Sequence, residues 1–313
     1  MRFVIFGNCQ QYGFATIAKA LAPDHEYFLH EPCHLITSEG LIKLRIDIAK
    51  ADVFIVQPIA NGYRDNFGIS TEELICFCKK DALIIKLPNI FFGGYYPSFD
   101  YLIAQNKVIS YRQENQLENV YGDYFDFFLL AAIEQELPIN DLIDVLWSKA
   151  TPKASEVISN IANESIATLR EKESSSSCNL IISDYVSENY KIQKLYHSLN
   201  HPANVLLFES VKRVLDLAGL AYNQETVIHR EILGNWRPPI YPLIESGLGL
   251  DFSNLDLAGG GINDYDMLRF VNPKECFKIF LNLIEKYSID TLLIGNQNRS
   301  CFINAKCILK AVF

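Results

Sequence analysis

Apolar and polar positions alternate along the N-terminal part of the chain in a pattern typical of parallel α/β proteins. The short, mostly apolar runs Arg2–Phe6, Val53–Val56 and 83–87 predict strands that are buried on both faces. Residues Gln10–Leu21 place apolar side chains at helical spacing, and Ser70 begins a second helix with the pattern of an N-cap. Because strand and helix patterns follow one another, this part is predicted to form a parallel sheet covered by helices.

Helical periodicity dominates the rest of the chain. It predicts helices over residues 124–134, 140–147, 152–171, 188–197, 203–217 and 276–286. The apolar run 180–182 is expected to be a strand, and the run 291–294 is expected to be either a strand or a buried segment. Residues 173–177 and 234–265 are expected to be irregular. We therefore expect an α/β fold with an α/β domain over residues 1–115 and a mainly helical domain over residues 116–313.

Composition and charge narrow the class of protein. The 313 residues are 49% hydrophobic, which is ample for a core, and the formal charge of −9 argues against a nucleic-acid partner. The N-terminus lacks the long apolar region of a signal peptide, and no run approaches the ~20 apolar residues of a membrane span. The eight cysteines are scattered, as expected for free thiols in a reducing cytoplasm.

The most informative feature is the turn GNCQ at residues 7–10, between the first predicted strand and the first predicted helix. A helix N-terminus favours a thiolate, so Cys9 is a candidate nucleophile. Gly7 allows a sharp turn, and free backbone N–H groups near Cys9 are candidate oxyanion donors. The alternative is an ordinary buried cysteine at a strand end.

His201 is the candidate base for such a nucleophile, because a histidine commonly accompanies a reactive cysteine. It lies in the segment Asn200-His201-Pro202, between two predicted helices, and His197 competes from about one helical turn away. The alternative is a histidine that only caps a helix. If Cys9 and His201 act together, the site is expected between the two domains.

Other motifs give weaker signals. The run of metal-ligand side chains at residues 30–34 has no second cluster at zinc spacing, so we expect a loop and no metal there. Cys76 and Cys78 lie two apart on a predicted helix and are expected to be structural. Residues 91–97 combine aromatic side chains with two glycines, and are expected either to line a pocket or to pack in the core. No phosphate-binding glycine motif follows the first strand.

Four motifs together resemble one family. GNCQ at residues 7–10, Gln57-Pro58, LPNIFFGGYYP at residues 87–97 and NHPAN at residues 200–204 are similar to the WcbI-type polysaccharide-biosynthesis proteins, to which acetyl transfer from coenzyme A is ascribed. The resemblance spans Met1 to about Phe252, and the family's N-terminal part looks like the SGNH hydrolases, whose nucleophile also follows the first strand. It implies that Cys9 is the nucleophile and His201 the base.

The chain departs from the family pattern at one position. Tyr96 stands where the family is expected to have the histidine of a Gly-Tyr-His-Pro segment, which bears on activity or substrate. The sequence also has no Asp-x-x-His pair of the SGNH kind. Asp184 is the candidate that would have to reach His201 through the fold.

The resemblance implies transfer of an acyl group, in particular acetyl, from coenzyme A to a hydroxyl of a sugar or polysaccharide precursor. The polysaccharide context that it implies is one such as capsule biosynthesis. In this interpretation Asn8, Gln10 and Gln57 hold the oxyanion or position the site. Coenzyme A would contact Gly7, Asn89, Tyr95 and Arg64, with Lys86, Arg112 and Arg213 as further basic candidates for its phosphates. The alternatives are a thioesterase or sugar deacetylase with the same Cys/His pair, or a non-catalytic module that binds coenzyme A or glycan.

Overall fold

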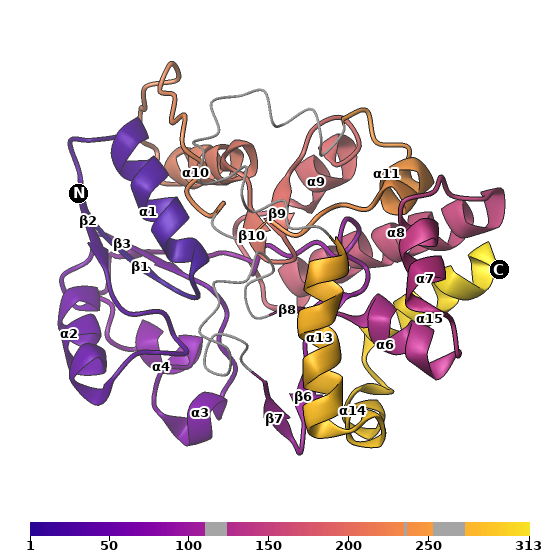
Figure 1. Ribbon diagram of the computed structural model, residues 1–313. Helices are drawn as coiled ribbons and strands as arrows, with labels where there is room; N and C mark the ends of the chain where they lie inside the picture. The colour runs from indigo at the N-terminus through magenta and orange to yellow at the C-terminus, as the bar shows by residue number, and fades with distance from the viewer. Residues whose placement is uncertain (110–123, 235–236, 253–272) are drawn as a thin grey trace. The chain divides into compact units, whose positions relative to one another are not determined.

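The computed structural model describes residues 1–109, 124–234, 237–252 and 273–313 (Figure 1). The chain divides into two compact units. The first unit comprises Met1–Phe91, Ile166–Glu188 and Asn200–Asn235, and the second comprises Phe92–Ser165, Asn189–Leu199 and Trp236–Phe313. This division differs from the expected one near residue 115, because two later segments return to the N-terminal unit. Composition along the chain does not reveal that the chain passes between the two units several times, so the division could not be predicted from it.

A parallel sheet forms the centre of the first unit, as predicted, and it has a fourth strand, β2 (Glu26–Leu29), that was not predicted. The predicted strands are β1 (Arg2–Phe6), β3 (Val53–Val56) and β4 (Leu83–Lys86), and the order in the sheet is β2-β1-β3-β4. The register pairs Phe6 with Val56, and Val56 with Lys86. The carboxyl ends of β1, β3 and β4 are therefore level, so the residues that follow these three strands lie along one edge.

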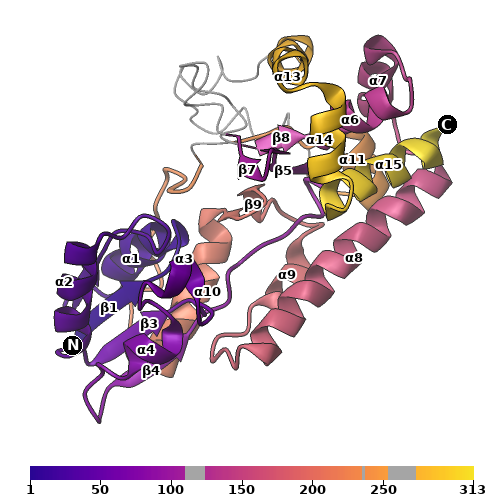
Figure 2. The ribbon, with the colours of Figure 1, turned by 90° about the horizontal axis from the view of Figure 1, so that it is seen from below.

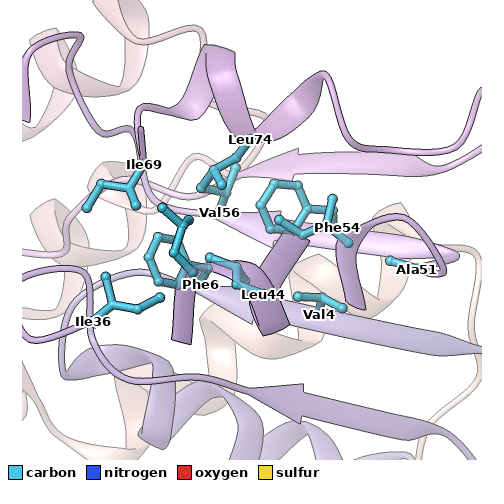
Figure 3. Close-up of a cluster of buried hydrophobic side chains, with 11 residues drawn as sticks. Val4, Phe6, Ile36, Leu44, Ala51, Phe54, Val56, Ile69 and Leu74 are labelled. Carbon is cyan, nitrogen blue, oxygen red and sulfur yellow. The ribbon is translucent and has the colours of Figure 1, made fainter. Parts of the chain in front are cut away.

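One face of the sheet is covered by α2 (Ser38–Ile48) and α4 (Thr71–Ile75). Between them and the sheet lies a fully apolar cluster that includes Phe6, Ile36 and Leu44 (Figure 3). The predicted N-cap at Ser70 is confirmed, and its hydroxyl and the Glu73 carboxylate form a reciprocal capping box. Cys78 packs against the same cluster, and Cys76 ends α4 with an exposed side chain.

The other face is covered by α1 (Gln10–Leu21) and α10 (Asn204–Leu217), which pack against each other (Figure 1). Both helices match the prediction. Their contact is close, since a methyl group on Gly13 would lie 2.7 Å from a terminal carbon of Leu207. The helix α10 begins three residues after His201, whose short strand β10 (His201–Pro202) belongs to the same unit.

The remaining parts of the first unit correct two predictions. Residues 180–182 form no strand, and Glu173 lies inside α8 (Pro152–Ser175) rather than in an exposed loop. The buried Glu173 carboxylate accepts hydrogen bonds from the N–H groups of Ile182 and Ser183 at the start of α9 (Ser183–Asn189). A side chain from the end of the preceding helix thus satisfies this backbone in place of a neighbouring strand. The short α3 (Tyr63–Asn66) is left-handed at Arg64 and Asp65.

The second unit is mainly helical, as predicted. It contains the antiparallel pair β5 (Phe99–Tyr101) and β8 (Tyr124–Asp126), the hairpin β6 (Ile103–Ala104) and β7 (Lys107–Val108), β9 (Tyr196–Ser198), and the helices α6 (Phe127–Glu134), α7 (Ile139–Leu146), α8 up to Ser165, α11 (Pro242–Leu248), α13 (Pro273–Tyr287), α14 (Ile289–Asn296) and α15 (Ser300–Val312). Figure 2 shows α15 beside α6, against which it packs. Four predictions are wrong here, in whole or in part. Residues 188–197 are not one helix, and 291–294 belong to the helix α14. Residues 124–126 of the predicted helix 124–134 form β8, and the segment 234–265, which was expected to be irregular, contains α11.

A buried carboxylate fixes the start of α6. Asp126 accepts hydrogen bonds from the hydroxyls of Ser98 (2.7 Å) and Tyr241 (2.5 Å) and from the Phe128 N–H (3.1 Å). Burial raises the pKa of Asp126 to about 6, against these hydrogen bonds, which lower it. The residue therefore titrates in a mildly acidic range.

Within the described ranges, no helix combines the length and the apolar character that crossing a membrane requires.

Candidate functional site

Cys9 lies at the turn between β1 and α1, where the sequence places it. It is the N-cap residue of α1 and is half-buried. Gly7 precedes it in close contact with Gln57: a Cβ on Gly7 would lie 2.3 Å from Oε1 of that side chain. Glycine is thus required here by space.

His201 faces this thiol. Its Nε2 atom lies 3.6 Å from the Sγ of Cys9, and the ring is buried. The preceding residue fixes the approach, because the side-chain amide of Gln10 donates a hydrogen bond to the Asn200 carbonyl (2.8 Å). Cys9 and His201 belong to the same unit, which differs from the expectation of a base on a separate C-terminal domain.

The electrostatic setting of Cys9 corrects one expectation. Burial raises the pKa of its thiol, and the backbone N–H groups of Cys9 and Gln10, which lower that pKa, do not compensate. A helix N-terminus therefore does not by itself make Cys9 a thiolate. Ionisation of this thiol calls for a proton acceptor, and Nε2 of His201 lies within reach of the proton.

A network of side-chain amides surrounds the turn. Gln57 accepts a hydrogen bond from the Asn8 N–H (2.6 Å) and donates one to Oε1 of Gln10 (2.9 Å). Gln10 donates to the Ile90 carbonyl (2.7 Å) and accepts from the Ile90 N–H (3.2 Å). The loops after β1, β3 and β4 are thus joined through two buried glutamine side chains.

The same network shows how the amides are engaged. The side-chain nitrogen of Gln10 donates to two carbonyl oxygens, and that of Gln57 donates to Gln10 Oε1. Their predicted role in positioning the site or holding an oxyanion stays a prediction. Asn8 uses its Oδ1 to accept from the Gln10 N–H (2.9 Å) and its Nδ2 to donate to Asn89 (3.0 Å). The structure therefore brings together Gly7, Asn8, Cys9, Gln10, Gln57, Asn89 and His201.

The basic candidates are dispersed. Arg64 donates hydrogen bonds to the carbonyls of Cys33 (3.3 Å) and Ile36 (2.8 Å), so it borders the loop next to the Gly7 turn. Lys86 is the last residue of β4, and its backbone N–H donates a hydrogen bond to Oδ1 of Asn179. Arg213 binds both oxygens of Asp184 (2.7 and 2.9 Å), and Arg112 lies outside the described residues.

Three further predicted residues are engaged elsewhere. Tyr95 belongs to the second unit, is 1% exposed and donates its hydroxyl to the Tyr190 carbonyl, so it presents no free face to a ligand. Tyr96 is equally buried and bonds the Tyr196 carbonyl. The segment 91–97 therefore contributes to a packed aromatic core, the second of the two alternatives. His197 is buried in the second unit.

The loop at residues 30–34 has a structural role. His30 Nε2 lies 3.2 Å from the Asp47 carboxylate, and in the described part of the chain no group of three or more His, Cys, Asp or Glu side chains is arranged to hold a metal ion.

Sequence reasoning did not single out Gln11 or Asn204. Gln11 accepts from the Gly7 N–H (3.1 Å) and donates to the His30 carbonyl (2.7 Å). Asn204 holds the segment after α10 through the carbonyls of Ile228 and Arg230 and the N–H of Ile232. The signal for Asn204 was present, since it is the last residue of the NHPAN motif, whereas Gln11 resembles any polar residue on a helix.

Comparisons with known proteins identify the family and the fold. The family model described as "Polysaccharide biosynthesis enzyme WcbI" matches residues 2–223. A search of curated proteins gave no match. Among solved structures, the chain is similar to WcbI, "a novel polysaccharide biosynthesis enzyme", described in a native form without a disulfide bond between coenzyme A and one of its cysteines. The TM-score is 0.72 at 18% identity, covering 100% of this chain and 99% of that one, which shows a shared fold. On the family match, this chain belongs to the WcbI polysaccharide-biosynthesis enzyme family.

Proposed function

We propose that this protein transfers an acyl group, in particular acetyl, from coenzyme A to a hydroxyl group of a sugar or polysaccharide precursor. The observation that supports this most directly is the 3.6 Å approach of Cys9 Sγ and His201 Nε2 at the start of α1. Family membership supports the polysaccharide context, and the solved relative, whose description pairs a cysteine with coenzyme A, supports the acyl donor.

In the covalent route, His201 removes the proton of the Cys9 thiol, and the thiolate attacks the acetyl carbonyl of acetyl-CoA. The carbon–sulfur bond to coenzyme A breaks, and the departing thiolate takes the proton back from His201. A sugar hydroxyl then gives its proton to His201 and attacks the acetyl-cysteine thioester. Cys9 leaves as thiolate and is reprotonated, so the enzyme returns to its starting state.

In the direct route, His201 removes the proton of the sugar hydroxyl, which attacks acetyl-CoA without an acyl-enzyme. Cys9 then positions the thioester. Both routes need donors for the carbonyl oxygen as it becomes negative. The backbone N–H of Cys9 is the candidate in either route, because those of Asn8 and Gln10 already donate to the side chains of Gln57 and Asn8.

Binding of coenzyme A is proposed to involve Asn8 and Asn89 beside the thiol and Arg64 near Cys33. A guanidinium group suits phosphate through paired N–H donors.

Calorimetric titration with coenzyme A tests the donor. We expect saturable binding to the parent protein, and its absence would overturn the proposal. Intact-mass analysis after addition of acetyl-CoA then distinguishes the routes. An acetyl group on Cys9, lost in Cys9→Ala and kept in Cys178→Ala, supports the covalent route. Cys178 is a suitable control because it is also half-buried in the first unit.

Product analysis with candidate sugars separates transfer from hydrolysis. Acetylated sugar supports the proposal. Free acetate without acetylated sugar indicates a thioesterase or deacetylase with the same Cys/His pair, and coenzyme A binding without turnover of any acceptor indicates a binding module.

A further inference from the structure

The helix α2 has apolar residues on two sides. Leu41, Leu44 and Ile48 belong to the cluster between α2 and the sheet, in which Figure 3 shows Leu44. By helical spacing, Ile42 and Ile46 lie on the opposite side of α2, and they are 59% and 49% exposed. A helix that only covers a sheet normally carries polar residues on its outer side. The packing of the first unit therefore does not account for these two isoleucines.

The exposed apolar residues of α2 are contiguous. Ile42 and Ile46 are four residues apart, so their side chains are neighbours on successive turns. Ala49, the exposed C-cap residue of α2, continues the same line. Single exposed apolar side chains are ordinary on a protein surface, whereas a contiguous group marks an interaction site. We call Ile42, Ile46 and Ala49 the outer strip of α2.

Charged residues flank the outer strip in a definite order. Glu39 lies in the first turn of α2 and forms an ion pair with Lys43 (2.7 Å) one turn later. Lys50 lies in the turn directly after α2, and all three side chains are exposed. By helical spacing, Glu39 and Lys50 lie along the same side of the strip. With an acidic residue at one end and a basic residue at the other, the strip is complementary to a reversed copy of itself.

Two copies of α2 fit this pattern when they run antiparallel. A two-fold axis between Ile42 and Ile46 places Ile42 of one copy opposite Ile46 of the other. At a rise of about 1.5 Å per residue, Glu39 of one copy then lies within about one residue of the level of Lys50 in the other. Parallel copies would instead bring two Glu39 side chains together at one end and two Lys50 side chains at the other. Charge complementarity therefore selects a second copy in the antiparallel direction.

We propose that the outer strip of α2 is the centre of a symmetric dimer of this protein. In this dimer Ile42 and Ile46 are buried against the same residues of the second copy, and a Glu39–Lys50 pair lies at each end. One side of an eleven-residue helix makes a small interface, which suits a reversible dimer with a dissociation constant roughly in the micromolar range. The dimer does not depend on the chemistry of Cys9, because α2 covers the face of the sheet opposite to α1.

Sedimentation velocity over a range of protein concentrations tests the dimer. We expect the parent protein to pass from monomer to dimer as its concentration rises. Ile42→Glu places a carboxylate in the apolar centre of the interface and should raise the dissociation constant at least about tenfold. Ile294→Glu is the matched control, because Ile294 is an isoleucine of the helix α14 in the second unit that is 74% exposed. It should dimerise like the parent protein.

Charge reversal tests the direction of the pairing. Glu39→Lys alone and Lys50→Glu alone each bring like charges together at both ends of the interface, so each variant should dimerise less than the parent protein. A mixture of the two variants restores opposite charges at both ends. Native mass spectrometry of the mixture should therefore show mixed dimers above their random proportion, and a random proportion would overturn antiparallel pairing through these residues.

Other outcomes would also overturn the proposal. A parent protein that stays monomeric at every concentration has no such dimer, and co-sedimentation with phosphatidylglycerol vesicles that is lost in Ile42→Glu would assign the outer strip to a membrane surface. Dimers that Ile42→Glu leaves intact would place the contact elsewhere. Calorimetric titration of the Ile42→Glu protein with coenzyme A keeps this proposal apart from the proposed function, since we expect binding with the affinity of the parent protein.

Discussion

The Sγ of Cys9 lies 3.6 Å from Nε2 of His201, although 192 positions separate the two residues in the chain. Burial disfavours a charge on the thiol, and the histidine nitrogen is the proton acceptor next to it. The reactivity of Cys9 should therefore depend on His201 more than on the helix N-terminus.

Substitution of His201 tests this dependence directly. In His201→Gln we expect the rate of Cys9 alkylation by iodoacetamide at neutral pH to fall by about 10²-fold, the lower range for loss of a general base. The parent rate should keep rising above pH 9, the ordinary pKa of a cysteine thiol. Peptide mass analysis measures both rates, with Cys178 as the internal standard. An unchanged Cys9 rate in the variant would mean that the histidine does not assist ionisation.

Gln57→Ala should disturb the turn without removing the Cys/His pair. It leaves the Asn8 N–H without its acceptor, whereas Gln10 Oε1 keeps the hydrogen bond from the Ile90 N–H. A buried polar group left unsatisfied costs about 1–3 kcal/mol. We expect a lower free energy of unfolding in urea, and acyl-transfer turnover reduced by about 10²-fold through misplacement of the donors near Cys9. Gln224→Ala changes a glutamine of the same unit that lies outside the network. Parent-like turnover in Gln57→Ala would contradict a positioning role.

Gly7→Ala should act through the same side chain. The added methyl group would overlap Gln57, and overpacking of this kind costs about 1–3 kcal/mol. In the double variant Gly7→Ala/Gln57→Ala the clash is absent. The losses of unfolding free energy in the two single variants should therefore sum to more than the loss in the double variant. Additive losses would show that Gly7 is required for another reason.

Asp184→Asn tests whether this carboxylate orients His201. Burial raises the pKa of Asp184, but hydrogen bonds from Arg213 outweigh this and hold it below its ordinary value. Because the pair is partly exposed, we expect a loss of only ~0–1 kcal/mol in unfolding free energy and unchanged turnover. A large loss of turnover with intact stability would connect Asp184 to the base.

The pH dependence of stability should reveal Asp126. Its folded pKa of about 6 lies above the ordinary 3.8, so between these values the folded state retains a proton that the unfolded state releases. Its contribution to stability is complete below pH 3.8 and is lost as the pH rises through 6, by up to about 1.4 kcal/mol per pH unit. Asp126→Asn should remove this component, so that the difference in unfolding free energy from the parent protein changes over that interval. A constant difference across pH would contradict it.

Much of the fold could be predicted from periodicity. The strands at Arg2–Phe6 and Val53–Val56 and the helix Gln10–Leu21 have strong local patterns, and the structure matches them residue for residue. The failures at 180–182 and 291–294 are short apolar runs, whose burial is the same in a strand or a helix. The arrangement at Glu173 depends on a contact between α8 and the start of α9, which no local pattern records.

The candidate site was predictable where residues follow a strand end. Cys9, Gln57 and Asn89 do so on three adjacent strands, and the level register brings them to one edge. His201 was predicted from the NHPAN motif at residues 200–204. The raised pKa of Cys9 was not predictable, because it results from burial by residues that are remote in sequence.

The hydrogen-bonding groups that frame Cys9 and His201 are amides, from the side chains of Asn8, Gln10, Gln11, Gln57 and Asn89 and from the backbone. Amides neither gain nor lose protons in the range where proteins are folded. The scaffold therefore keeps the same donors and acceptors from acid to alkaline conditions, and dissolved salt has no ion pair to screen within it. A change in Cys9 reactivity with pH can accordingly be assigned to the ionisable side chains of the site, with the surrounding frame as a constant background.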